Sequence, residues 1–119
     1  MRRRSLVIVV LAAACAAAAA RASAPPVGAL PPGPIATIAT TKGEYLAVAL
    51  PARKGGRVWR IARPFDAKVV GQTAETDATG TVIVVFKAVG RGQTTIVFAL
   101  TRGETKRAYE SRRYVVTVT

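Results

Sequence analysis

Few residues of this sequence could carry out chemistry, and their types exclude most forms of catalysis. The 119 residues include no histidine and one cysteine, Cys15. Ser111, the only serine after Ser23, therefore has no imidazole to activate it as a nucleophile. Glu75 and Asp77 are the one close carboxylate pair, whereas calcium takes about six or more oxygen ligands. The sequence predicts a protein that is not an enzyme, with no metal site and no cofactor.

Positive charge is the main chemical character of the chain. Lysine and arginine number 18 against 6 acidic residues, which gives a formal net charge of +12. The basic clusters and the aromatic residues among them are residues 53–63, 106–107 and 112–113, with Trp59, Phe65 and Tyr109. Such a mixture can bind nucleic acid, but it also keeps a small protein soluble. We expect no nucleic-acid partner, because the N-terminal segment predicts export.

The N-terminal segment has the pattern of a secretory signal peptide. Three arginines at positions 2–4 precede an uninterrupted apolar run over residues 6–20, and Ala22-Ser23-Ala24 provides small residues at cleavage spacing. A helix of this apolar run would span about 22 Å, less than the ~30 Å of a bilayer core. We therefore predict a signal peptide over residues 1–24, no membrane span, and a secreted or periplasmic protein.

Cys15 leaves one alternative open for this segment. Ala12-Ala13-Ala14-Cys15 faintly resembles a lipoprotein cleavage box, but its leucine, Leu11, stands four residues before the cysteine instead of three. Ordinary cleavage is the preferred interpretation, and a lipid anchor at Cys15 is the alternative. Cleavage near Ala24 leaves a chain without cysteine, whose stability cannot depend on a disulfide.

The rest of the chain alternates short apolar strands with turns. Residues 25–34 hold five of the seven prolines and are expected to be a leader outside the core. Strands are expected near residues 35–41, 44–50, 57–62, 67–70, 81–89, 93–101 and 109–119, with a polar loop over residues 71–80. Seven short strands in one domain, residues 35–119, predict an all-β, immunoglobulin-like β-sandwich; a small β-barrel is the alternative.

Two strands carry specific expectations. Residues 82–86 are continuously apolar, so their strand is expected to be central and covered on both faces. Trp59 lies on the third strand, where its ring is expected to fill the core between two sheets. Both expectations are consistent with a β-sandwich.

Assembled in order, five segments resemble the chagasin family, the immunoglobulin-fold inhibitors of papain-like cysteine proteases. The resemblance covers roughly residues 43–119. Its segments are Gly43-Glu44 with the strand to Leu50-Pro51, Gly56 with Trp59, Phe86-Lys87-Ala88-Val89-Gly90, Gln93–Leu100 with Arg102, and Arg113-Tyr114-Val115-Val116.

The resemblance implies a monomeric, non-enzymatic inhibitor that places three loops in the cleft of a papain-like cysteine protease. By position these loops are residues 52–56, 72–80 and 102–108. The implied protease-binding residues are Arg53, Lys54, Gly55, Gly56, Arg102, Gly103 and Glu104. Gly103 and Glu104 stand where the family has proline and tryptophan. The alternative hypothesis is a divergent immunoglobulin-like module that binds an acidic protein or an anionic envelope polymer.

Overall fold

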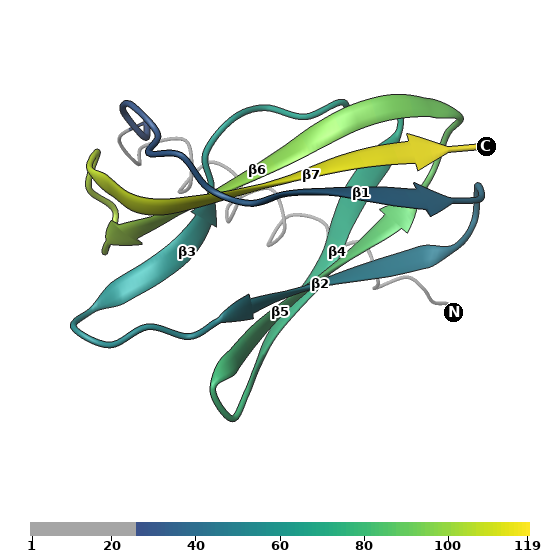
Figure 1. Ribbon diagram of the computed structural model, residues 1–119. Helices are drawn as coiled ribbons and strands as arrows, with labels where there is room; N and C mark the ends of the chain where they lie inside the picture. The colour runs from purple at the N-terminus through teal and green to yellow at the C-terminus, as the bar shows by residue number, and fades with distance from the viewer. Residues whose placement is uncertain (1–25) are drawn as a thin grey trace, which may run out of the picture.

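The structure is a computed structural model that describes residues 26–119, and it consists of two packed β-sheets (Figure 1). The strands are β1 (Ile35–Thr40), β2 (Tyr45–Pro51), β3 (Arg57–Ile61), β4 (Val70–Ala78), β5 (Thr81–Ala88), β6 (Gly92–Arg102) and β7 (Ala108–Val118). One sheet has the order β1-β7-β6-β3 and the other β2-β5-β4. The predicted immunoglobulin-like sandwich is confirmed. The predicted signal peptide and Cys15 lie outside the described residues.

The core lies between the sheets and follows from alternation along the strands. In β2, Leu46, Val48 and Leu50 are buried, while the residues between them are exposed. Phe86 of β5 and Phe98 of β6 meet edge to face across the two sheets, with ring centroids 6.3 Å apart. Burial of these apolar side chains is the main force that holds the two sheets together.

Strand β5 is central in its sheet, as expected, and pairs with β2 on one side and β4 on the other. Its coverage is less complete than expected. Val84 and Phe86 are buried, but Ile83 and Val85 on the other face are only half-buried. The second face of this sheet is therefore partly open to solvent.

The prediction of a short fourth strand near residues 67–70, followed by a polar loop over residues 71–80, was wrong. A single strand, β4, pairs with β5 from Val70 to Ala78, with a bulge between Gln72 and Ala74. Nearly all of its residues are exposed, because β4 is the edge of a sheet and lies over no third layer. Residues 72–78 bury neither face and so show no apolar alternation, which makes their polar sequence typical of a loop. Its carboxylates protect the edge against pairing with other chains.

The proline-rich segment, residues 26–34, forms no strand, yet it is bound to the four-stranded sheet; we call it the strap. Val27 is buried. The Arg63 guanidinium donates hydrogen bonds to the carbonyl oxygens of Val27 (3.1 Å) and Gly28 (2.9 Å). The Ser111 hydroxyl donates to the Pro31 carbonyl at 2.6 Å. The strap contributes no residue to the main core cluster, but hydrogen bonds attach it to the domain.

Candidate functional site

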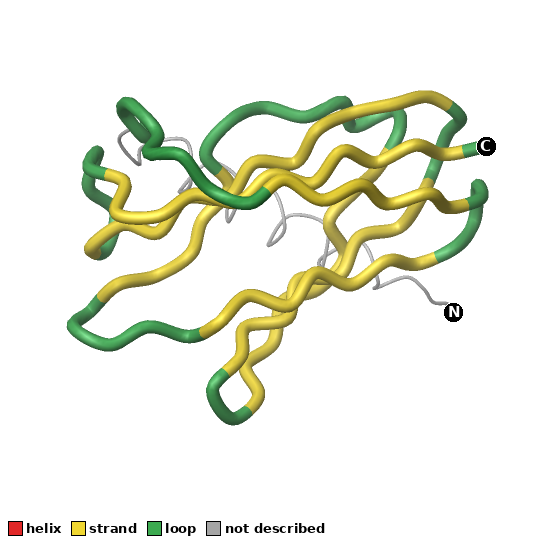
Figure 2. The backbone as a smooth tube through the Cα atoms, viewed as in Figure 1, coloured by secondary structure: helices red, strands yellow, loops and turns green. Residues whose placement is uncertain are grey.

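Three connections lie toward the end of the sandwich opposite the C-terminus, which we call the loop end; Figure 2 shows two of them at this end and the β4–β5 turn projecting below them. They are residues 52–56 between β2 and β3, the turn at residues 79–80 between β4 and β5, and residues 103–107 between β6 and β7. The Ala52 amide donates to the Gly80 carbonyl at 3.0 Å, and the Gly103 amide donates to the Gly56 carbonyl at 3.1 Å. The first loop is thus bonded to both of the others.

The first loop owes its shape to the residues at its two ends. Pro51 is the last residue of β2. Gly55 and Gly56 have φ values of 79° and 73°, in the left-handed region that disfavours residues with a β-carbon. These two glycines turn the chain back into β3, so the loop is short and its backbone conformation is defined.

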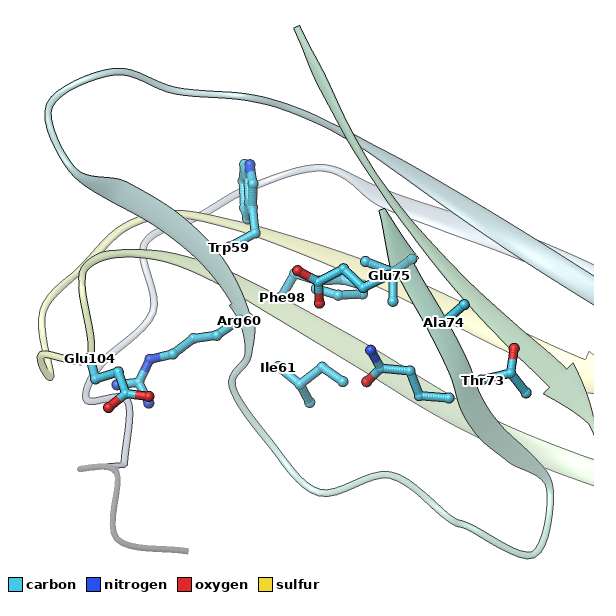
Figure 3. A pocket seen from close by; sticks show the side chains of 10 residues that line it. Trp59, Arg60, Ile61, Thr73, Ala74, Glu75, Phe98 and Glu104 are labelled. Carbon is cyan, nitrogen blue, oxygen red and sulfur yellow. The ribbon is translucent and has the colours of Figure 1, made fainter. Parts of the chain in front are cut away.

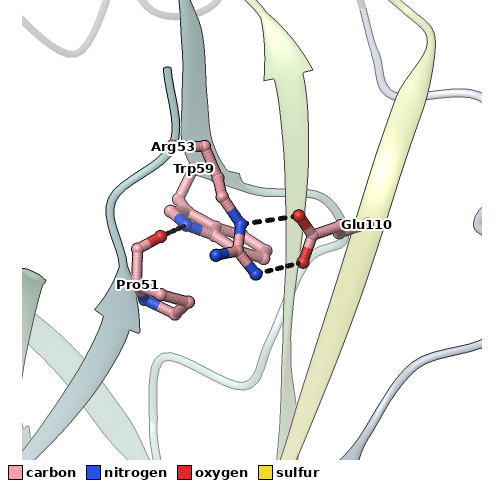
Figure 4. Close-up of polar contacts among 4 residues, drawn as sticks. All are labelled: Pro51, Arg53, Trp59 and Glu110. Carbon is pink, nitrogen blue, oxygen red and sulfur yellow. Dashed lines mark hydrogen bonds and ion pairs between the residues drawn. The ribbon is translucent and has the colours of Figure 1, made fainter.

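Arg53 ties the first loop to β7 (Figure 4). Its Nε donates to Glu110 Oε2 at 2.7 Å and its Nη2 donates to Glu110 Oε1 at 3.0 Å, a two-bond pair between partly exposed side chains. The hydrogen bonds from Arg53 lower the pKa of Glu110 below its ordinary value, while partial burial opposes the change. The same bonds raise the pKa of Arg53.

Trp59 supports the first loop from below. Its ring belongs to the core, as expected, and its Nε1–H donates to the Pro51 carbonyl at 2.8 Å. This bond closes the base of the first loop, because Pro51 is the last residue before the loop and Trp59 is the third residue of β3, the strand that follows the loop. The tryptophan therefore fills the core and fixes the start of the loop.

Besides its bond to the first loop, the third loop is fixed by bonds to three further segments. Gly103 adopts a φ of 58°, and its carbonyl accepts a 2.6 Å bond from the buried Thr101 hydroxyl. The Arg60 guanidinium donates to the Thr105 carbonyl at 2.6 Å. The strap reaches the loop as well, since the Gly28 amide donates to the Lys106 carbonyl at 2.8 Å.

The structure brings the seven sequence-predicted site residues to the loop end, although not all in the same way. Six of them are exposed: Lys54, Gly55 and Gly56 in the first loop, Gly103 and Glu104 in the third, and Arg102 at the end of β6. Arg53 is also exposed, but its guanidinium is engaged by Glu110 instead of being free. Sequence reasoning missed Glu110, whose role depends on a contact with a residue 57 positions away.

The second of the three expected loops is much shorter than predicted. Residues 72–78 belong to β4, and only Thr79 and Gly80 turn the chain into β5. Gly80 has a φ of 75°, which permits this two-residue turn. The surface that this segment offers at the loop end is therefore a hairpin tip and not a long loop.

A groove of about 590 Å³ runs along the side of the sandwich, between the edge strands β3 and β4 (Figure 3). Its floor is formed by core residues, and its walls by Arg60 of β3 and by Gln72 and Glu75 of β4. Glu104 of the third loop also lines this groove. Within residues 26–119 no group of acidic or cysteine side chains is arranged to hold a metal ion.

Comparison with known proteins supports the fold. The arrangement defines an immunoglobulin-like β-sandwich with three loops gathered at one end. Among solved structures, the chain is similar to the crystal structure of EhICP2, a cysteine protease inhibitor from Entamoeba histolytica, which is an inhibitor of the chagasin family. The TM-score is 0.55 and the sequence identity 18%, over 75% of this chain and 99% of that chain. At this identity the likeness shows the fold.

Sequence comparisons add no relative. No protein-family model matches the chain, and no curated protein matches it. Nor does any helix in the described part of the chain have the length and apolar character to cross a membrane.

Proposed function

We propose that this protein is an exported, non-enzymatic inhibitor of papain-like cysteine proteases that blocks the protease cleft with its loop end. The observation that carries the proposal is the bonding of the first loop to both neighbours, through Ala52–Gly80 and Gly56–Gly103, on a fold similar to that of a cysteine protease inhibitor. Export is supported by the signal-peptide pattern of residues 1–24.

A loop inhibits a protease well when its backbone is already held in the bound shape. The first loop meets this condition: Trp59 fixes its start, Arg53 ties it to β7, and the Gly56 carbonyl is bonded to the third loop. Such a loop loses little conformational entropy when it docks. It also resists cleavage, because a fixed backbone cannot easily adopt the geometry that the protease nucleophile attacks.

The contact residues are assigned by exposure and position. Lys54, Gly55 and Gly56 form the tip that would lie deepest in the cleft, since two residues without side chains allow close backbone approach. Arg102 and Glu104 would flank it from the third loop. Lys54 and Arg102 favour a cleft with acidic walls and would speed the encounter with it. Arg53 would act through the loop conformation, because Glu110 occupies its guanidinium.

The test is a titration of the purified residues 25–119, which include every contact described above, into papain and into a cathepsin-L-like protease. Hydrolysis of a fluorogenic peptide is expected to fall in proportion to the inhibitor added. Lys54→Glu and Arg102→Ala should weaken inhibition about tenfold or more, which corresponds to the loss of one good interface contact. Arg91→Ala is the matched control, because Arg91 lies exposed between β5 and β6, at the other end of the sandwich.

A folded protein that leaves both proteases fully active at stoichiometric concentration would contradict the proposal. Circular dichroism on the same sample establishes that it is folded. Equal weakening by the Arg91→Ala control would also contradict it, because inhibition would then depend on total charge instead of on the loop end.

A further inference from the structure

Arginine side chains gather around Tyr109 and Glu110, beside the loop end; we call Arg53, Arg57, Arg102, Arg107 and Arg112 the arginine cluster. The Arg57 guanidinium carbon lies 4.0 Å from the centre of the Tyr109 ring, and that of Arg107 lies 4.8 Å from it. Arg112 lies over the Trp59 ring at 5.7 Å. Arg57 and Arg102 stand directly opposite each other on β3 and β6. The cluster therefore draws on three neighbouring strands and both adjoining loops.

A bulge in β7 places Tyr109 among these arginines. Glu110 pairs with Leu100 and Ala108 pairs with Thr101, so Tyr109 has no partner position on β6. Its ring packs against the core cluster and is free to receive two guanidinium groups. A bulge commonly redirects a side chain in this way next to a functional site.

The charges of the cluster are not balanced within the chain. Glu110 is its one carboxylate, and Arg53 takes both of its oxygens. Within residues 26–119 this is the only ion pair, so Arg57, Arg107 and Arg112 have no carboxylate partner there. Like charges directly opposite on neighbouring strands, as for Arg57 and Arg102, are unfavourable without a counter-ion.

Arg112 has a side-chain nitrogen that lacks a hydrogen-bond partner. Its Nε is buried and has no hydrogen-bond partner, the only such side-chain nitrogen or oxygen in the described chain. Buried donors are nearly always paired, and an unpaired one calls for an explanation. After Arg53, the charge of Arg112 also lowers the pKa of Glu110.

We propose that the arginine cluster binds an oxyanion of the phosphate or sulfate type, held chiefly by Arg57, Arg107 and Arg112 around Tyr109. Guanidinium groups present paired donors that match the oxygens of such anions, and they remain charged at every accessible pH. The Tyr109 hydroxyl can donate a further bond. This binding does not depend on the proposed inhibition.

Nearby carboxylates limit where the anion can sit. A second hollow, of about 320 Å³, is lined by Arg53 and Arg57 but also by Glu75 and Asp77 of β4. These two carboxylates would repel an anion. The anion is therefore expected on the side of Arg57 that faces Tyr109 and Arg107, and not in this hollow.

The experiment measures anion binding by the protein alone. Inorganic phosphate, sulfate and pyrophosphate are titrated into residues 25–119, with Trp59 fluorescence and calorimetry as readouts and with sodium chloride at equal ionic strength as the reference. Trp59 is the only tryptophan and lies against Arg112, so its emission reports on this site. We expect saturable binding, with pyrophosphate tighter than either single anion because its two groups can span separate guanidiniums.

A matched pair of double variants decides whether the cluster is the site. Arg57→Gln with Arg112→Gln should weaken pyrophosphate binding about tenfold or more, as expected when charge-assisted bonds are removed. Arg91→Gln with Arg113→Gln removes the same charge elsewhere; Arg113 is exposed and follows Arg112, so it faces the other side of β7. This control should change binding less than about twofold.

Three outcomes would overturn the proposal: no saturable binding beyond the chloride reference, equal weakening by both double variants, or binding by the cluster variant at wild-type strength. A longer polyphosphate and a sulfated polysaccharide then distinguish the sources of the anion. If either polymer binds more tightly than pyrophosphate, and the cluster variant loses this difference, the site is assigned to a polymer. If neither polymer binds more tightly, the ligand is a small free anion. Because no protease is present, failure here leaves the inhibition test unaffected, and the reverse is also true.

Discussion

Arg53 and Glu110 are 57 residues apart in the sequence, and their side chains join the first loop to β7 by two hydrogen bonds of 2.7 and 3.0 Å. The pair makes the conformation of this loop dependent on the ionisation of one carboxylate. That dependence can be measured without knowing the partner of the loop.

Glu110→Gln is expected to remove a pH-dependent part of the stability. Because Arg53 lowers the pKa of Glu110 in the folded protein, the unfolded chain takes up the proton first as the pH falls. The contribution of the pair is therefore present above the ordinary glutamate pKa and is lost as the pH falls through the lowered folded-state pKa. Urea-denaturation midpoints at several pH values between about 3 and 7 should show a wild-type advantage at neutral pH that disappears in acid.

Glu104→Gln provides the control for this measurement. Glu104 is an exposed carboxylate of the third loop with no ion-pair partner among the described residues. Its replacement should leave the difference between neutral and acid midpoints unchanged. A pH profile of Glu110→Gln that parallels the wild type would show that the pair does not stabilise the fold.

Trp59→Phe should lower the free energy of unfolding by about 1–3 kcal/mol, because it leaves the Pro51 carbonyl without its donor and opens space in the core. Val58→Ala is the neighbouring control; its side chain is 47% exposed, and the expected loss is below about 0.5 kcal/mol. Urea unfolding followed by far-UV circular dichroism measures both. Equal effects of the two substitutions would argue against a special role for the indole.

Gly33→Ala should detach the strap. A β-carbon at this position would overlap the Ser111 carbonyl oxygen, so the backbone must move. We expect a loss of about 1–3 kcal/mol and faster exchange of the Gly28 amide hydrogen, which is bonded to Lys106. Hydrogen exchange followed by NMR detects the second effect. Gly71→Ala, where a β-carbon meets nothing within 4 Å, should leave the Gly28 amide protected.

Substitutions at Gly56 test the effect of backbone strain separately from the effect of a steric clash. A β-carbon there meets nothing within 4 Å, but the φ of 73° is unfavourable for most residues. Gly56→Val should therefore destabilise the protein by about 1–2 kcal/mol and weaken any inhibition, whereas Gly56→Asn should lose less than half as much, because asparagine tolerates this conformation. Unfolding midpoints and protease titrations of the two variants provide the comparison. Indistinguishable variants would show that the glycine conformation is not required.

The sequence predicted the sandwich because most strands bury one face. The alternation of Leu46, Val48 and Leu50 indicated both the strand and its inner face, and the structure confirms both. The alternation is absent where burial is absent: residues 72–78 form part of β4, but both faces of this edge are open, so the polar sequence resembled a loop. The pattern of apolar residues therefore indicates which positions are buried, and it indicates secondary structure only where an element buries one of its faces.

The contacts that hold the candidate site were not predictable in the same way. Arg53 and Arg63 are two similar arginines in the sequence, yet one binds a carboxylate on β7 and the other binds carbonyl oxygens of the strap. Which partner each one meets is decided by the packing of distant segments. The glycines were easier to interpret than the arginines, because Gly55 and Gly56 indicated the turn that the structure shows.

The parallel pairing of β1 with β7 has a consequence for how the chain folds. Ile35 to Thr40 pair with residues 113–118 of β7, which is synthesised after the other six strands, and β7 also forms the link between β1 and β6. The four-stranded sheet therefore cannot form completely before β7 has been synthesised. Long-range pairing of this kind makes folding slow. A nascent chain that ends before β7 would expose two unpaired strand edges, so premature termination should yield an aggregation-prone product and not a smaller folded domain.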